Sequence, residues 1–125
     1  MTEALIHEAV CRYLKLKYPA VMFNTDLSGV RLTTGQAIRA KALRSSRAWP
    51  DLFIPEPRKG HYGLFIELKR EGERLYTKDG RPASDHIKAQ DGMIQELRSR
   101  GYMAVFACGF DQARGIIDNY FKATE

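Results

Sequence analysis

Asp51, Glu67 and Lys69 place charged side chains within a largely apolar stretch, WPDLFIPEPRKGHYGLFIELK at positions 49–69. Burying a carboxylate or an ammonium costs free energy unless the group is paired or used. Carboxylate oxygens are the ligands that Mg²⁺ prefers, and one or two suffice because Mg²⁺ keeps several waters. We therefore expect Asp51 and Glu67 to bind Mg²⁺ or Mn²⁺, with the backbone carbonyl of Leu68 as a further ligand.

A lysine beside such a metal site fits the hydrolysis of a phosphodiester bond. The metal orients or acidifies the attacking water and neutralises charge that develops on the phosphate. The Lys69 ammonium would stabilise negative charge that grows in the transition state. The alternative is structural, with an edge-strand ion pair between Glu67 and Lys69 and with Asp51 as a turn residue. The Pro50–Asp51 pair, at hairpin distance from Glu67, favours the catalytic interpretation.

Two strands joined by a hairpin turn are predicted to position these side chains. The segments Leu52–Ile54 and Tyr62–Leu68 contain branched and aromatic residues and are bounded by Pro and Gly. Side chains alternate along a strand, so Glu67 and Lys69 share one face and the apolar residues between them share the other.

Apolar periodicity predicts further elements on both sides of this hairpin. Helices are expected over 2–17, from Ser84 or Asp85 to Arg100, and from a cap at Asp111 to about position 121. Additional strands are expected at 21–24 and 103–107. Gln90 interrupts the apolar face of the second helix, so it either satisfies a backbone group or reaches into a site. The polar segment after Lys69 is expected to be a loop.

The segment between Asp26 and Asp51 carries the whole positive surplus of the chain, whose net charge is +5. This segment has no acidic residue. A short helix is expected within it, from Gln36 to about Ser45, with Ile38, Ala42 and Leu43 facing inward. The five basic residues of the segment are Arg31, Arg39, Lys41, Arg44 and Arg47. Clustered basic residues supply most of the affinity for phosphates, so DNA binding is favoured over a merely solvated basic surface.

Length and composition predict a single α/β domain over residues 1–125, with a small mixed β-sheet flanked by helices. Apolar residues make up 44% and charged residues 28%, as in ordinary soluble proteins. No membrane helix or signal peptide is visible, which favours a cytoplasmic location. Cys11 and Cys108 are expected to be free thiols, because they lack metal-ligand spacing.

The pattern resembles a known family. Pro50-Asp51 followed by Glu67-Leu68-Lys69 is similar to the PD-(D/E)xK nuclease superfamily. Its VRR-NUC branch of virus-type replication and repair nucleases is similar over nearly the whole chain. The matching stretches are EALIH at 3–7, WPDLFI at 49–54, GLFIELK at 63–69, HIKAQ at 86–90 and GYMAVF at 101–106.

This resemblance implies a restriction-endonuclease-like fold, dependence on Mg²⁺ or Mn²⁺, and DNA as the substrate. Small stand-alone phage members of the family are associated with homodimers that cut branched DNA such as Holliday junctions, in a bacterial cell or phage-infected host.

The resemblance also implies residue roles. Asp51 and Glu67 correspond to the metal carboxylates, Lys69 to the catalytic lysine and Gln90 to the helix glutamine of the site. The first-helix glutamate falls on Glu3, with Glu8 as the fallback. The family often has Gln where this chain has His7, so the role of His7 stays open.

Two rival functions are compatible with the same residues. A less selective DNA nuclease, acting in phage recombination or packaging, would use every proposed catalytic side chain. A catalytically inactive DNA-binding module would show salt-sensitive binding without metal-stimulated turnover.

Overall fold

A mixed four-stranded sheet forms the centre of the protein in the computed structural model, which describes residues 1–26, 31–46 and 48–122. The strands are β1 (Asn24–Thr25), β2 (Leu52–Ile54), β3 (Leu64–Lys69) and β4 (Met103–Cys108), in the order β1-β2-β3-β4. The β1–β2 and β2–β3 pairs are antiparallel, and β3–β4 is parallel. The expected α/β fold with a small mixed sheet is therefore confirmed.

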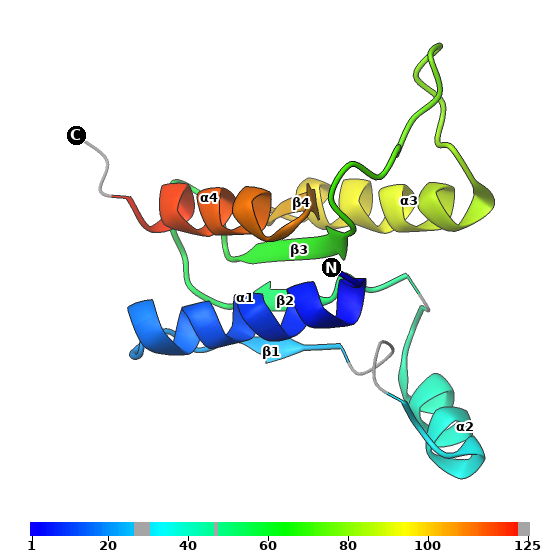
Figure 1. Cartoon of the computed structure of the whole chain (residues 1–125), viewed down its shortest axis with the longest axis horizontal. Helices are drawn as coiled ribbons and strands as arrows, with labels where there is room; N and C mark the ends of the chain where they lie inside the picture. The colour runs from blue at the N-terminus through cyan, green and yellow to red at the C-terminus, as the bar shows by residue number, and fades with distance from the viewer. Residues whose placement is uncertain (27–30, 47, 123–125) are drawn as a thin grey trace.

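Four helices accompany the sheet (Figure 1): α1 (Glu3–Lys17), α2 (Thr34–Leu43), α3 (Asp85–Ser99) and α4 (Phe110–Phe121). The Thr2 side chain caps α1 and the Ser84 side chain caps α3, each by accepting a backbone N–H bond. The prediction that Asp111 caps α4 is wrong. The cap is Gly109 with a φ of 91°, and Asp111 lies in the first turn, where its charge favours the helix dipole.

Two apolar clusters hold the sheet between the helices. The larger joins α1 and α4 to one face of β2 and β3, and its buried members include Ile6, Val10, Leu64, Ile66 and Ile117. The smaller joins α3 to the other face through Phe65, Ile94, Leu97 and Ala104. Because β3 is buried on both faces, it is a central strand, and its charged side chains are enclosed.

The helix α2 departs from the prediction. Ile38 and Leu43, expected to point inward, are 66% and 73% exposed, and none of the ten described residues of α2 is buried. Figure 1 shows α2 projecting from the body of the protein. A capping box between Thr33 and Gln36 supports the helix instead of packing. The periodic pattern correctly indicated a helix, but it could not show that the helix lacks a partner surface.

The first strand also differs from the prediction. A strand is expected at 21–24, but β1 comprises only Asn24 and Thr25. Val21 and Phe23 pack beside the larger apolar cluster without joining the sheet, so their apolar character reflects packing. No helix in the described part of the chain is long and apolar enough to cross a membrane.

Candidate active site

The register of β2 and β3 brings Asp51 to Glu67. Leu52 pairs with Ile66, so the position immediately before β2 lies opposite Glu67 on β3. Opposed side chains of an antiparallel pair point to the same face of the sheet. The two carboxylates, which are sixteen residues apart in sequence, therefore lie next to each other at one end of the β2–β3 pair.

A backbone amide fixes the Asp51 side chain. Leu68 N–H donates to Asp51 Oδ2 over 2.8 Å, which ties the residue before β2 to the end of β3. Burial raises the pKa of Asp51 above its ordinary value, while the Leu68 amide and then the charge of His7 act in the opposite direction. The Leu68 amide thus contacts Asp51 directly, and metal binding by the Leu68 carbonyl stays a prediction.

Glu67 is 4% exposed and is held by Gln90. Gln90 Nε2 donates to Glu67 Oε1 over 2.6 Å from the buried face of α3. Burial first, and repulsion from Asp51 second, raise the pKa of Glu67 to about 9. A buried carboxylate that resists ionisation beside a second carboxylate is ready to receive a cation, because a positive charge would stabilise both.

Lys69 follows on the same face of β3 and is 2% exposed. Its Nζ lies 4.0 Å from Glu73 Oε2, and it pairs in register with Cys108 of β4. Its charge lowers the pKa of Glu67, against the effect of burial, so the ammonium acts directly on the carboxylate site. Glu73 comes from the loop after β3 and was not predicted, since no periodic pattern relates a loop residue to a strand residue.

The charges of Glu3 and His7 on α1 act on the two carboxylates. The charge of Glu3 raises the pKa of Glu67, although the Glu3 side chain is exposed. Glu8, the alternative, lines a separate surface hollow with Cys11 and Lys15. Glu3 thus acts electrostatically on Glu67, and its role as the first-helix glutamate stays a prediction. The spacing of His7 from Glu3 was the available signal for His7, because residues four apart share a helix face.

Three buried side-chain atoms in the described part of the chain have no hydrogen-bond partner: His7 Nε2, Glu67 Oε2 and Gln90 Oε1. Glu67 is bonded to Gln90, so two of these atoms lie close together, and the charge of His7 lowers the pKa of Asp51. Buried polar atoms normally have hydrogen-bond partners, so buried atoms without one indicate a bound ion or water. Each of the three can offer a lone pair to a cation or its water.

A divalent cation fits these donors. No group of three or more acidic, histidine or cysteine side chains is gathered as a ready cage among the described residues. Mg²⁺ does not require one, because one or two carboxylates and several waters complete its shell. Asp51 and Glu67 supply that minimum, and the unpaired Gln90 oxygen adds an acceptor for a metal-bound water.

The basic residues of the central segment differ in availability. Arg31, Arg39 and Lys41 are exposed. Arg44 is partly buried, and its Nη1 lies 3.3 Å from Asp26 Oδ2, so it contributes to internal structure. Arg47 lies outside the described residues.

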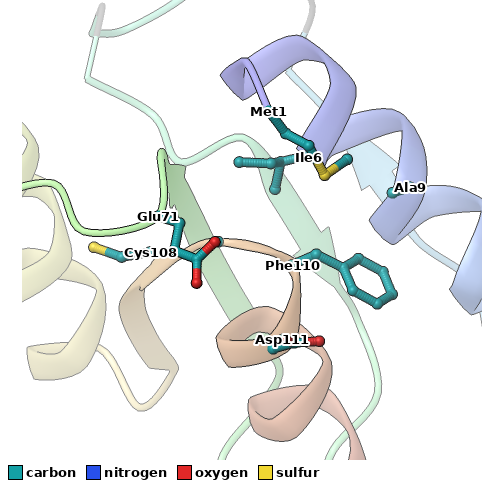
Figure 2. A pocket seen from close by; sticks show the side chains of 8 residues that line it. Met1, Ile6, Ala9, Glu71, Cys108, Phe110 and Asp111 are labelled. Atoms are coloured by element: carbon teal, nitrogen blue, oxygen red, sulfur yellow. The ribbon is translucent and has the colours of Figure 1, made fainter.

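A cavity of about 290 Å³ lies between α1 and the start of α4 (Figure 2). Ile6, Glu71, Cys108 and Phe110 are among the residues that line it. Cys108 and the other cysteine, Cys11, are free thiols, as expected. Asp51, Glu67 and Lys69 do not line this cavity.

Comparison with solved structures identifies the fold. A structure described as a VRR_NUC domain protein is 26% identical, with a TM-score of 0.67 over 97% of this chain and 88% of the other. The chain has the fold of a VRR-NUC domain. A second structure, described as a VRR_NUC domain, has a TM-score of 0.53 at 18% identity and covers 97% of this chain and 100% of its own.

The VRR-NUC assignment rests on structure, because the sequence matches no family model and no curated protein. It confirms the family resemblance and supports a nuclease domain. The carboxylates at one end of the β2–β3 pair, the neighbouring lysine and the helix glutamine are the features of this chain that bear on its chemistry.

Proposed function

We propose that this VRR-NUC domain is a DNA endonuclease that depends on Mg²⁺ or Mn²⁺. The observation that carries the proposal is the meeting of Asp51 and Glu67 across the β2–β3 pair, beside the buried ammonium of Lys69. Such a group of two carboxylates and a lysine suits hydrolysis of a phosphodiester far better than it suits structural support, since burying it costs stability.

Asp51 and Glu67 would hold the metal, with Glu3 and the Leu68 carbonyl as further candidates. The bound ion supplies a Lewis acid that activates water and neutralises charge on the phosphate. Gln90 orients Glu67 through its 2.6 Å hydrogen bond and leaves the Glu67 Oε2 atom free for the site. Residues fixed in this way lose little freedom when the substrate binds.

Lys69 would stabilise the developing negative charge on the phosphate. Its side chain is 3% exposed, so water screens its charge poorly and the interaction is stronger than at the surface. The Glu73 carboxylate at 4.0 Å limits where the ammonium can lie and thus orients it.

Exposed basic residues would hold the DNA. Figure 1 shows α2 projecting at the end of the molecule where α1 begins and β3 ends, which is the end that carries the carboxylate site. Arg39 and Lys41 on α2, together with Arg31, are exposed and available to phosphates. Arg44 would act indirectly, because its ion pair with Asp26 ties the end of α2 to the residue after β1. Arg47 stays a proposed phosphate contact.

More specifically, the protein is proposed to act as a homodimer on branched DNA. A two-fold dimer would set two active sites against opposed strands of a symmetric junction. The exposed Ile38 and Leu43 of α2 support association, since an apolar pair on a projecting helix gains stability from a partner. Sedimentation at assay concentrations is expected to give a dimer; a monomer throughout would remove the junction-resolving version.

A substrate panel tests the function. Labelled four-way junction, flap and linear duplex would be incubated with Mg²⁺, Mn²⁺ or EDTA. We expect metal-dependent cleavage, fastest on the junction. Equal rates on all three substrates would favour the less selective nuclease. Salt-sensitive binding without cleavage of any substrate would replace the enzyme with a DNA-binding module.

A further inference from the structure

An open hollow of about 760 Å³ lies on the face of the sheet that carries Glu67. Phe65, which lines it, lies two residues before Glu67 on β3. Phe53, which also lines it and pairs with Phe65, lies two residues after Asp51. Side chains two apart on a strand point to the same face, about 7 Å from each other. The hollow is therefore next to the two carboxylates along the strands, within the reach of a single nucleotide.

Four aromatic rings form the wall of this hollow, which we call the aromatic pocket. Phe53 stacks on Phe65, with ring centroids 4.2 Å apart and an interplanar angle of 13°. Trp49 and Tyr102 flank this pair, with their ring centroids 5.9 Å and 5.3 Å from that of Phe65. Trp49 Nε1 donates to Ser45 Oγ over 3.2 Å, which fixes the indole in place. Trp49, Phe53 and Tyr102 are only partly buried. Soluble proteins rarely leave a continuous aromatic surface open to water, so this surface indicates a flat apolar occupant.

Charged and amide groups stand at the rim of the aromatic pocket. The Asn24 side chain supplies an amide that can both donate and accept hydrogen bonds. The Asp26 carboxylate is paired with Arg44 at 3.3 Å, so it does not leave the rim acidic. Arg100 adds an exposed positive charge. Its ion pair with Glu96 lies at the surface, where such pairs contribute little, so a phosphate can compete for the guanidinium. Flat apolar walls, hydrogen-bonding groups and a basic rim together match a nucleotide.

We propose that the aromatic pocket receives one unpaired nucleobase of the DNA whose backbone lies at Asp51 and Glu67. The inference rests on the proposed nuclease function and adds the feature of the substrate that the protein recognises. Aromatic side chains stack on any base, so the pocket selects an unpaired base and not a sequence. A base without a paired partner costs the least free energy to unstack, and branched DNA exposes bases most readily where its strands diverge. The pocket thus favours branched or single-stranded DNA over an intact duplex.

Single-stranded oligomers that differ only in their bases test the inference without cleavage. Trp49 is the only tryptophan of the chain, so its fluorescence reports on the pocket directly. In EDTA, the wild type would be titrated with a labelled thymidine oligomer and with an abasic oligomer of the same length, which keeps every phosphate. We expect the thymidine oligomer to quench Trp49 and to bind on the order of 10- to 100-fold more tightly than the abasic one. Equal affinities, or saturation with the thymidine oligomer without a change in Trp49 fluorescence, would overturn the inference.

A variant of the pocket separates stacking from charge. Trp49→Leu stays apolar but loses the indole, so its affinity for the thymidine oligomer, measured by anisotropy, should fall on the order of 10- to 100-fold. Its affinity for the abasic oligomer should stay the same, and an equal loss for both oligomers would overturn the inference. Tyr62→Ala is the control, because Tyr62 is 68% exposed and does not line the pocket. It should bind both oligomers as the wild type does. The wild-type fluorescence titration needs no variant, so it decides the question if Trp49→Leu folds poorly.

Three further results separate the pocket from the nuclease function. A wild type that cleaves DNA with Mn²⁺ but binds the two oligomers equally would overturn the pocket and leave the nuclease intact. A wild type that prefers the thymidine oligomer but cleaves no DNA would support the pocket and overturn the nuclease. Trp49 fluorescence that changes with protein concentration in the absence of DNA would assign the pocket to a second copy of the chain and overturn the inference.

Discussion

Gln90 shows how one polar residue on an apolar helix face can organise a site. Its amide donates to Glu67 and stays 6% exposed between α3 and the sheet. The interrupted apolar stripe of α3 is visible in the sequence, so Gln90 could be predicted, and the structure supplies its contact with Glu67. The Leu68 amide bond to Asp51 and the Glu73 contact with Lys69 have no such signal, because they depend on how loops and strand ends meet.

Replacing Gln90 by Leu should destabilise the protein. The change leaves Glu67 Oε1 buried without its donor, at a cost of about 1–3 kcal/mol in the free energy of unfolding. Urea unfolding at neutral pH measures it. Gln95→Leu is the matched control, because Gln95 lies on the same helix and is exposed. Equal stability of the two variants would show that the Gln90–Glu67 bond contributes nothing.

At the scale of the elements, sequence periodicity identified α1, α3, β2, β3 and β4. Each of them buries a regular apolar face, and such a face leaves a periodic pattern in the sequence. The periodicity failed for the face of α2, where Ile38 and Leu43 are exposed, and for β1, where apolar residues pack without pairing. Both errors have one physical origin, because a local sequence pattern does not specify which part of the protein the segment will pack against.

The projecting α2 should act as a DNA-binding element. Arg39→Ala with Lys41→Ala removes two exposed charges, so the slope of log affinity against log salt should fall in magnitude by about two. Fluorescence anisotropy with duplex DNA over a range of salt measures this slope. Lys15→Ala with Lys122→Ala is the control, near the ends of α1 and α4 farthest from α2 in Figure 1. A salt slope equal to that of the control pair would exclude α2 from the DNA contact.

At the scale of the whole molecule, burying the carboxylates links stability to pH. The pKa of Glu67 is raised to about 9 from 4.5, so the folded protein holds a proton that the unfolded chain releases. This contribution to stability is fully present below pH 4.5 and is lost as the pH rises through about 9. The metal-free protein should therefore become less stable from about pH 5 to about pH 9, and Mn²⁺ should restore most stability at the alkaline end.

Glu67→Gln, which mimics the protonated side chain, should flatten this decline. The difference from the wild type at about pH 8 should be on the order of 1–3 kcal/mol in favour of the variant, without metal. Thermal unfolding at several pH values measures it, with the exposed Glu96→Gln on α3 as control. A wild type whose stability rises between about pH 5 and about pH 9 would contradict the sign of the link.

The central claim, that Asp51 belongs to a metal-dependent active site, is tested most directly by single-turnover cleavage of DNA with saturating Mn²⁺. Three proteins are compared: the wild type, Asp51→Asn and Asp111→Asn. Asp111 is the matched control, because its side chain is exposed at the start of α4, where its Oδ1 lies 3.6 Å from Arg114 Nη2. We predict that Asp51→Asn loses at least about 100-fold in rate while Asp111→Asn retains the wild-type rate. An Asp51→Asn rate within about twofold of the wild type would contradict the proposed active site.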